Sequence, residues 1–204
     1  MTTTLSLLNT FPNTQSDSQI IYRLLLDSLS KPGTIADVPT ALCLQEENYL
    51  PSSVWAIAQT LFDADTKVYV SAMLANDTVL QSLSFHTNAV VVSEQLHADF
   101  AIIPLSELNT LDDFMLGDIA KPHKSSTVLV VVDALSHGES LYLQGPGIEV
   151  QRAISIASMS DQQITLLRAN HELYPCGVDF IFCAPQQWLA LPRSTVVSCA
   201  DEAI

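Results

Sequence analysis

Several stretches of the chain repeat hydrophobic residues with the period of an α-helix. Between residues 16 and 30, isoleucines and leucines recur every three or four positions, Ser16 and Asp17 can cap the start, and Lys31-Pro32-Gly33 ends the pattern. Pro51 suits the start of a second helix, because its fixed φ is already helical. The pattern predicts helices over residues 16–30, 52–62, 76–85, 106–115 and 161–173.

Other stretches are typical of β-strands. Residues 67–71 alternate between the two faces of a strand, whereas residues 127–132 are almost entirely apolar and β-branched, as in a strand buried on both faces. Gly145-Pro146-Gly147 is expected to form a turn between two strands. Further strands are predicted over residues 89–93, 100–103, 141–143, 153–157, 178–183, 188–191 and 195–198.

The order of these elements predicts the fold class. Helices that interleave with strands indicate a layered α/β/α arrangement with helices on both faces of one sheet. The last strands follow one another with short turns, so the central sheet is expected to be mixed. No repeat, low-complexity segment or linker divides the chain, and residues 1–204 are therefore expected to form a single domain, with 1–14 and 200–204 as flexible termini.

The composition adds an expectation about association. Hydrophobic residues make up 48% of the chain and charged residues 15%, with a mean hydropathy of +0.28; an average soluble domain has roughly 25% charged residues. No apolar run approaches the roughly 18 residues of a membrane-spanning helix. The apolar excess is expected to be covered by another protein surface. The alternative is a large and efficient core.

The charge balance narrows the choice of ligand and location. The net charge is −14, from 22 acidic and 8 basic side chains, and this disfavours nucleic-acid binding. A polyphosphate site would have to be built locally from arginines and backbone N–H groups. The first nine residues lack the features of a signal peptide, and the four scattered cysteines read as free thiols, so a cytoplasmic location is expected.

No short catalytic motif is present. The sequence holds no GxSxG, HExxH, Walker A or GxGxxG pattern, and no catalytic residue is assigned. Gly145-Pro146-Gly147 could cradle a phosphate, but its proline lacks one of the N–H groups that such a loop uses, which favours a plain turn. The histidines show no metal-ligand spacing, so no metal is expected.

A few polar residues are candidates for binding a small anion. His86 near a helix end can exchange protons or contact phosphate, or simply complement the helix dipole. Asp179 at the start of a strand is either a loop cap or a functional carboxylate. An arginine in so acidic a chain can bind a ligand, or it can neutralise a carboxylate of the chain itself. Helix and strand ends converge at one rim of an open α/β sheet. The expected cluster is Arg23, His86, Asp179 and Arg193.

Six segments of the chain carry a recognisable pattern, among them Ser28-Leu29-Ser30-Lys31-Pro32-Gly33 and Tyr174-Pro175-Cys176-Gly177-Val178-Asp179. In this order and at this spacing, the six segments resemble the PhnH family. The resemblance runs from about residue 15 to residue 197, with two departures. Ser84 stands where family members often carry arginine before Phe-His, and residues 121–126 form a loop of which an acidic or aromatic version is common in relatives. The segments are residues 22–33, 65–70, 82–88, 143–148, 174–179 and 191–195.

The resemblance implies a fold and a role. The fold would be related to the large domain of pyridoxal-phosphate-dependent transferases, without the cofactor lysine and with no cofactor. The chain would be a homodimer that associates with the G, I, J and K components of the carbon–phosphorus lyase complex. Its step would be the one in which a phosphonate displaces adenine from ATP to give a ribose 1-phosphonate 5-triphosphate, with another subunit as the seat of the chemistry.

Three hypotheses remain open from the sequence. The first is an accessory subunit of such a transferase complex, a ribose 1-methylphosphonate 5-triphosphate synthase. The second is an independent pyridoxal-phosphate transferase, although Lys31, Lys67, Lys121 and Lys124 are the only lysines and none lies in a pocket-like context. The third is a cofactor-independent module that binds a small anion or a nucleotide.

Overall fold

A computed structural model describes residues 7–44 and 50–199, apart from the side chains of residues 138–140. Three of the four α-helices in the described residues begin at a polar cap, whereas the second begins after Pro51. Asn13 accepts a hydrogen bond from the backbone N–H of Ser16, and Ser160 forms a reciprocal capping box with Gln163. The helices of the described residues are α1 (Thr14–Ser30), α2 (Ser52–Leu61), α3 (Asp77–Thr87) and α4 (Asp161–Glu172).

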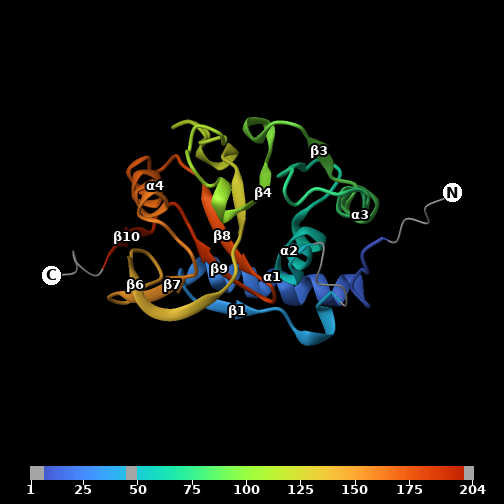
Figure 1. Cartoon of the computed structure of the whole chain (residues 1–204), viewed down its shortest axis with the longest axis horizontal. Coiled ribbons are helices and arrows are strands. Elements are labelled where there is room, and N and C mark those ends of the chain that lie inside the picture. The colour runs from blue at the N-terminus through green and yellow to red at the C-terminus, as the bar shows by residue number, and fades with distance from the viewer. Residues whose placement is uncertain (1–6, 45–49, 200–204) are drawn as a thin grey trace.

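A seven-stranded mixed sheet forms the centre of the molecule (Figure 1). Its strand order is β1-β9-β8-β5-β4-β2-β3. The strands β8, β5, β4, β2 and β3 run parallel to one another, whereas β9 pairs antiparallel with β8 and β1 pairs antiparallel with β9. The expected mixed sheet is therefore confirmed. The bounds are β1 Ile35–Asp37, β2 Lys67–Val70, β3 Val90–Val92, β4 Phe100–Pro104, β5 Thr127–Val131, β8 Asp179–Ala184 and β9 Gln187–Leu191.

A second, smaller sheet was not expected. The strands β6 (Leu135–Gln144), β7 (Arg152–Ile156) and β10 (Val196–Ser198) pair antiparallel in the order β10-β6-β7. The expectation of one sheet that includes these strands is therefore wrong. The pattern of one strand cannot reveal which partner it pairs with, because pairing is decided by distant residues.

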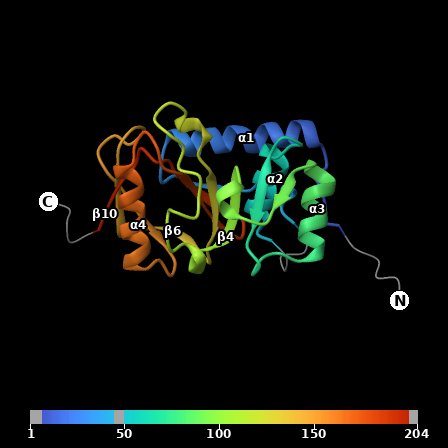
Figure 2. The same ribbon diagram turned by 90° about the horizontal axis from the view of Figure 1, so that it is seen from above.

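Two hydrophobic cores share the main sheet. Alternate residues of β4, β5 and β8, such as Ile102, Leu129 and Ile181, pack under α1, α2 and α3. Their neighbours, such as Ile103 and Val130, face the opposite core, which α4 and the small sheet cover. In Figure 2, α1 runs along one side of the molecule while α3 and α4 lie at its two ends. Helices thus occur on both faces, with a small sheet as part of one layer.

Two local expectations differ from the structure. Residues 106–115 do not form an α-helix; a short 3₁₀ turn at Leu105–Glu107 is followed by loops. The acidic and polar residues there favour turns, and buried Leu108 and Phe114 anchor the loop instead. The N-terminal segment, expected to be flexible, has Leu8 and Phe11 buried in the core, whereas residues 1–6 and 200–204 lie outside the described residues.

The described residues contain no helix that is both long and apolar enough to cross a membrane. Within the interior, Cys183 of β8 is fully buried beside Ser53, and burial raises the pKa of its thiol well above the ordinary range. Such a thiol stays protonated and unreactive at neutral pH.

The turn that joins β6 and β7 packs against the end of α1. A Cβ added at Gly147 would overlap the carbonyl oxygen of Ser30, and Gly147 has φ of +82°. Both constraints favour glycine at this position. The expected turn between two strands is confirmed, and it also forms a contact between the small sheet and a helix of the opposite layer.

The Gly147→Ala variant should therefore be less stable than the natural chain. We expect the free energy of unfolding to fall by more than about 1 kcal/mol, because the added methyl meets backbone and the left-handed φ disfavours alanine. Urea unfolding followed by circular dichroism measures this. Exposed Glu149 in the same turn provides the control, since Glu149→Ala should stay within about 0.5 kcal/mol of the natural chain. Equal effects of the two substitutions would contradict the proposed close contact.

Candidate functional site

Four of the six segments that carry the family resemblance meet at one place, here named the motif corner. It comprises residues 30–34, 143–148, 174–179 and 191–195. The corner lies at the amino edge of the parallel strands, because β8 begins there and antiparallel β9 ends there. A Cβ at Gly145 would lie 3.0 Å from the carbonyl oxygen of Ser194, so the turn and the segment after β9 are in close contact.

The strongest interaction of the motif corner is an ion pair between Arg193 and Asp179. The Arg193 Nη2 donates to Asp179 Oδ2 at 2.6 Å, and Nε donates to Oδ1 at 3.1 Å. The backbone N–H of Arg193 also donates to Oδ1 at 2.9 Å, and Nη1 donates to the carbonyl oxygen of Pro122 at 2.8 Å. The two side chains are 15% and 25% exposed. Each group is thus bound within the chain, as the structural interpretation of these residues predicts.

A second arginine fixes the end of α1. Arg152 of β7 donates through Nη1 to the carbonyl oxygens of Lys31 and Pro32, at 2.9 and 2.7 Å, and to the Thr34 hydroxyl at 2.7 Å. A cation at this end of the helix complements the partial negative charge of the last carbonyls. Arg152 therefore connects the small sheet to α1, and sequence reasoning missed it because its partners are more than a hundred residues away.

The structure does not bring the four candidate residues into one cluster. Asp179 and Arg193 meet, but Arg23 is exposed on α1, where a shallow groove against Thr60 of α2 includes it. His86 lies on α3, which Figure 1 places at the opposite end of the molecule from α4 and the motif corner. The expectation of a single rim is therefore wrong, because helix and strand ends point to different edges of the sheet. Binding by any of the four residues stays a prediction.

His86 packs edge-on against Trp55 of α2, with ring centroids 5.9 Å apart. Its ring is partly exposed, but the Nε2 atom itself is buried and has no hydrogen-bond partner in the described part of the chain. Burial lowers the pKa of His86, and a hydrogen bond from the ring to the backbone of Leu8 opposes this in part. The neutral imidazole is therefore favoured in the folded state.

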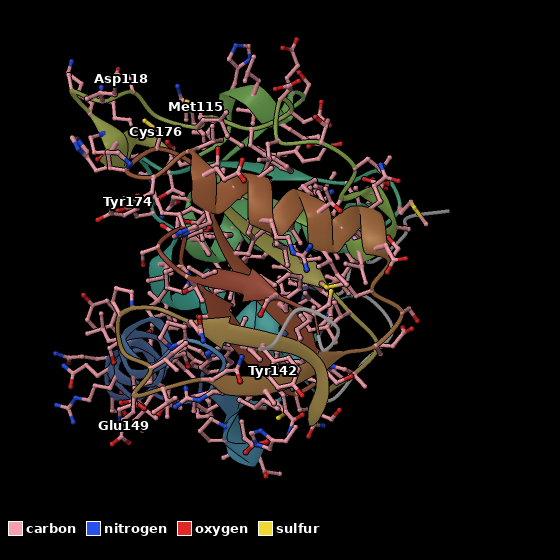
Figure 3. The ribbon with its side chains drawn as sticks, turned by 90° about the vertical axis from the view of Figure 1, so that its left-hand side faces the viewer. Met115, Asp118, Tyr142, Glu149, Tyr174 and Cys176 are labelled. Carbon is pink, nitrogen blue, oxygen red and sulfur yellow. The ribbon has the colours of Figure 1, made fainter. Side chains whose placement is uncertain are left out.

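One face of the motif corner carries exposed apolar side chains. Gly177 N–H donates to the carbonyl oxygen of Leu116, which brings the loop before β5 against the loop before β8. Figure 3 shows Tyr174 and Cys176 beside Met115 and Asp118 as a result, with Glu149 on the far side of the same view. Ile119, next to Asp118, is 85% exposed, and Tyr174 is 60% exposed.

The carboxyl edge of the same sheet carries a cavity that sequence reasoning missed. It lies beyond the ends of β4 and β5, and its polar residues are Ser106, Asp133, Ser158 and Gln163. The signal that could have found it is Asp133, which follows directly after the predicted buried strand 127–132. Polar residues at that position of an α/β sheet are frequent parts of ligand sites.

Comparisons with known proteins agree with the resemblance. Residues 9–198 match the family described as bacterial phosphonate metabolism protein (PhnH). The chain is 32% identical over 180 residues, 88% of this chain and 89% of the other, to a protein of Rhizobium meliloti (strain 1021) named alpha-D-ribose 1-methylphosphonate 5-triphosphate synthase subunit PhnH. It is 24% identical over 182 residues, 88% of this chain and 85% of the other, to the putative C-P lyase subunit protein HtxG of Stutzerimonas stutzeri.

The Asp179–Arg193 pair should couple strongly in a double-mutant cycle. Asp179→Ala, Arg193→Ala and the double variant, unfolded in urea, are expected to give a coupling energy of about 1–3 kcal/mol, because several charge-assisted hydrogen bonds are lost together. The exposed pair of Asp27 and Lys31, 2.6 Å apart on α1, is the matched control and should couple by at most about 0.5 kcal/mol. Similar coupling in both pairs would contradict the structural role.

His86 should make stability depend on pH. Its pKa is lowered in the folded state, so below the ordinary histidine value of 6.5 the unfolded chain binds more protons. Stability contributed by the neutral ring is therefore present above pH 6.5 and decreases as the pH falls below it. The His86→Gln variant should lose less stability than the natural chain between pH 7.5 and 5.5, as measured by urea midpoints. Exposed His123→Gln is the control, and an equal change in slope for both variants would rule out the effect.

Proposed function

We propose that this chain, which belongs to the PhnH family of bacterial phosphonate metabolism proteins, is a subunit of a ribose 1-methylphosphonate 5-triphosphate synthase within the carbon–phosphorus lyase machinery. The observation that carries this proposal is the similarity to a subunit of that name over 88% of the chain and 89% of the relative. The similarity therefore concerns the whole fold, including both hydrophobic cores, rather than one shared motif.

The geometry favours an accessory role over a self-sufficient enzyme. Asp179 and Arg193 of the motif corner bind each other, and Arg152 binds the end of α1, so these charged groups are used for contacts within the chain. The corner also lies at the amino edge of the parallel strands, whereas ligands of open α/β sheets bind beyond the carboxyl ends. The segments that carry the family resemblance thus stabilise the fold and hold an exposed surface in position.

That surface is the proposed site of association. The exposed side chains of Ile119 and Tyr174 lie at the rim of the motif corner, beside an internally bonded framework that holds them in place. Exposed large apolar side chains on a rigid edge are favourable anchors for a partner protein. The apolar excess of the composition is in keeping with such a contact.

The proposal extends to the oligomeric state, the location, the partners and the fold relationship of the chain. We propose a homodimer of single-domain chains in the cytoplasm, associated with the G, I, J and K components, and a fold related to the large domain of pyridoxal-phosphate-dependent transferases. The main sheet shared by both cores supports a single domain.

An independent pyridoxal-phosphate transferase has no support from the side chains. A Schiff-base lysine is normally held in a desolvated pocket. Lys31, Lys67, Lys121 and Lys124 are instead all exposed, and Lys31 is paired with Asp27. This placement favours the accessory role.

Reconstitution of the complex tests the proposal. Adenine release from ATP with methylphosphonate should require this chain together with the G, I, J and K components, while sedimentation of the chain alone should show a dimer at micromolar concentration. Full activity of the isolated chain would refute the accessory role. Full activity of the other components without it would refute the requirement, and a stable monomer would refute the homodimer.

Charge substitutions test the proposed surface. Ile119→Asp and Tyr174→Asp should reduce co-purification with the other components at least tenfold, because a buried unpaired carboxylate strongly disfavours a contact. Met73→Asp is the matched control, since Met73 is 70% exposed in the loop between β2 and α3, outside the motif corner. Loss of co-purification for all three variants alike would contradict the assignment of the surface.

A further inference from the structure

A cavity of about 280 Å³ lies at the carboxyl edge of the main sheet. Its walls come from the segments that follow β4, β5 and β7, and from the first turn of α4. The Ala157 N–H donates to the carbonyl oxygen of Ala134 at 3.0 Å, which joins the segment after β7 to the segment after β5. The cavity thus lies where open parallel sheets place their ligands, and at the opposite edge from the motif corner.

A buried glutamine holds the walls in position. Gln163 of α4 is only 7% exposed. Its Nε2 donates to the carbonyl oxygen of Leu105, and its Oε1 accepts from both the backbone N–H and the hydroxyl of Ser160. One side chain therefore connects the segment after β4 to the start of α4, and the cavity is formed before any ligand arrives. When a site is preformed, less of the binding free energy is lost to ordering the protein around the ligand.

Ser158 adds an unusual backbone conformation at the cavity. Its φ is +62°, a region that non-glycine residues rarely adopt. Asn88 has a similar φ of +58°, but it is the C-cap of α3, where that conformation is routine. Ser158 caps no helix; it is exposed and lines the cavity. The conformation sets the direction of a hydroxyl at the rim, and strain of this kind is concentrated at functional sites.

The polar groups of the cavity define the chemistry it can accept. Among the described residues, those that line the cavity include no lysine, arginine or histidine. The carboxylate of Asp133 is exposed, and within residues 7–44 and 50–199 it has no recorded hydrogen-bond or ion-pair partner. A phosphate would be repelled by this carboxylate, whereas a ligand with hydroxyl groups could donate to it. Ser106 and Ser158 supply further hydroxyls that both donate and accept.

The size of the cavity limits the part of a ligand that it can enclose to about a single ring. Pockets for drug-sized molecules measure roughly 300–1,000 Å³, so the cavity of about 280 Å³ is too small for a whole nucleoside triphosphate. The apolar lining residues Leu105 and Val132 are buried and suit the carbon face of a sugar ring. The polar lining residues Ser106, Asp133 and Ser158 are exposed.

We propose that this cavity binds the ribose of a nucleotide, with the 2′- and 3′-hydroxyls donating to the Asp133 carboxylate and the phosphates directed away from it. This inference rests on the proposed function, because the ribosyl group of the synthase product gives a reason for a sugar subsite. The acidic chain would supply the sugar subsite, and the phosphate contacts would come from a more basic partner subunit.

Nuclear magnetic resonance titration of the full-length chain tests the subsite with defined probes. Adenosine should shift the backbone amide signals of Ser106, Asp133 and Ser158. We expect 2′-deoxyadenosine to bind at least tenfold more weakly, because one hydrogen bond to the carboxylate is missing, and inorganic triphosphate to cause no shift at these residues. Equal binding of the two nucleosides, shifts confined to other residues, or triphosphate binding at the cavity would overturn the proposal.

Variants separate the subsite from folding and from assembly. Asp133→Asn should weaken adenosine binding at least tenfold, and Ser158→Gly, which relaxes the backbone but removes the hydroxyl, should weaken it several-fold without loss of stability. Exposed Asp112→Asn, outside the cavity, is the matched control. Unchanged binding in Asp133→Asn would refute the subsite. Co-purification with the other components should persist in Asp133→Asn. If the natural chain binds adenosine but does not join the complex, the proposed function is refuted and the sugar subsite is not.

Discussion

The structure depends on one sheet that is buried on both faces. Parallel pairing of β8, β5, β4 and β2 places alternate side chains in two separate cores, and every helix covers one core or the other. Burial of apolar area on two sides stabilises these strands. Because the strands run parallel, their amino ends and carboxyl ends form two distinct edges, and the two edges of this protein differ in chemistry.

At the amino edge, polar groups are used for cohesion. Arg152 binds the end of α1, Arg193 binds Asp179, and Gly147 allows the turn after β6 to touch Ser30. These contacts connect the small sheet, the main sheet and a helix of the opposite layer. In a chain with four arginines and a net charge of −14, using two of them here leaves few cations for a phosphate site. A subunit of this composition is suited to working beside partners that supply positive charge.

At the carboxyl edge, the polar groups face a cavity instead of one another. Asp133 and Ser158 are exposed there, while Gln163 is buried and ties the walls together. At the amino edge, the Gly145-Pro146-Gly147 turn packs against Ser30 and Ser194. At the carboxyl edge, the segments after β4, β5 and β7 surround the cavity.

The sequence alone determined the long helices, the buried strands and the mixed sheet, because helical and strand periodicities are local and residues 128–131 are apolar throughout. The six ordered segments also identified the family. Tertiary structure decided what no local pattern contains: that β6, β7 and β10 form their own sheet, that residues 106–115 are a loop anchored by Leu108 and Phe114, and that His86 lies far from Arg193. Partners of strands and charges are chosen across a hundred residues or more, and only the packed chain brings them together.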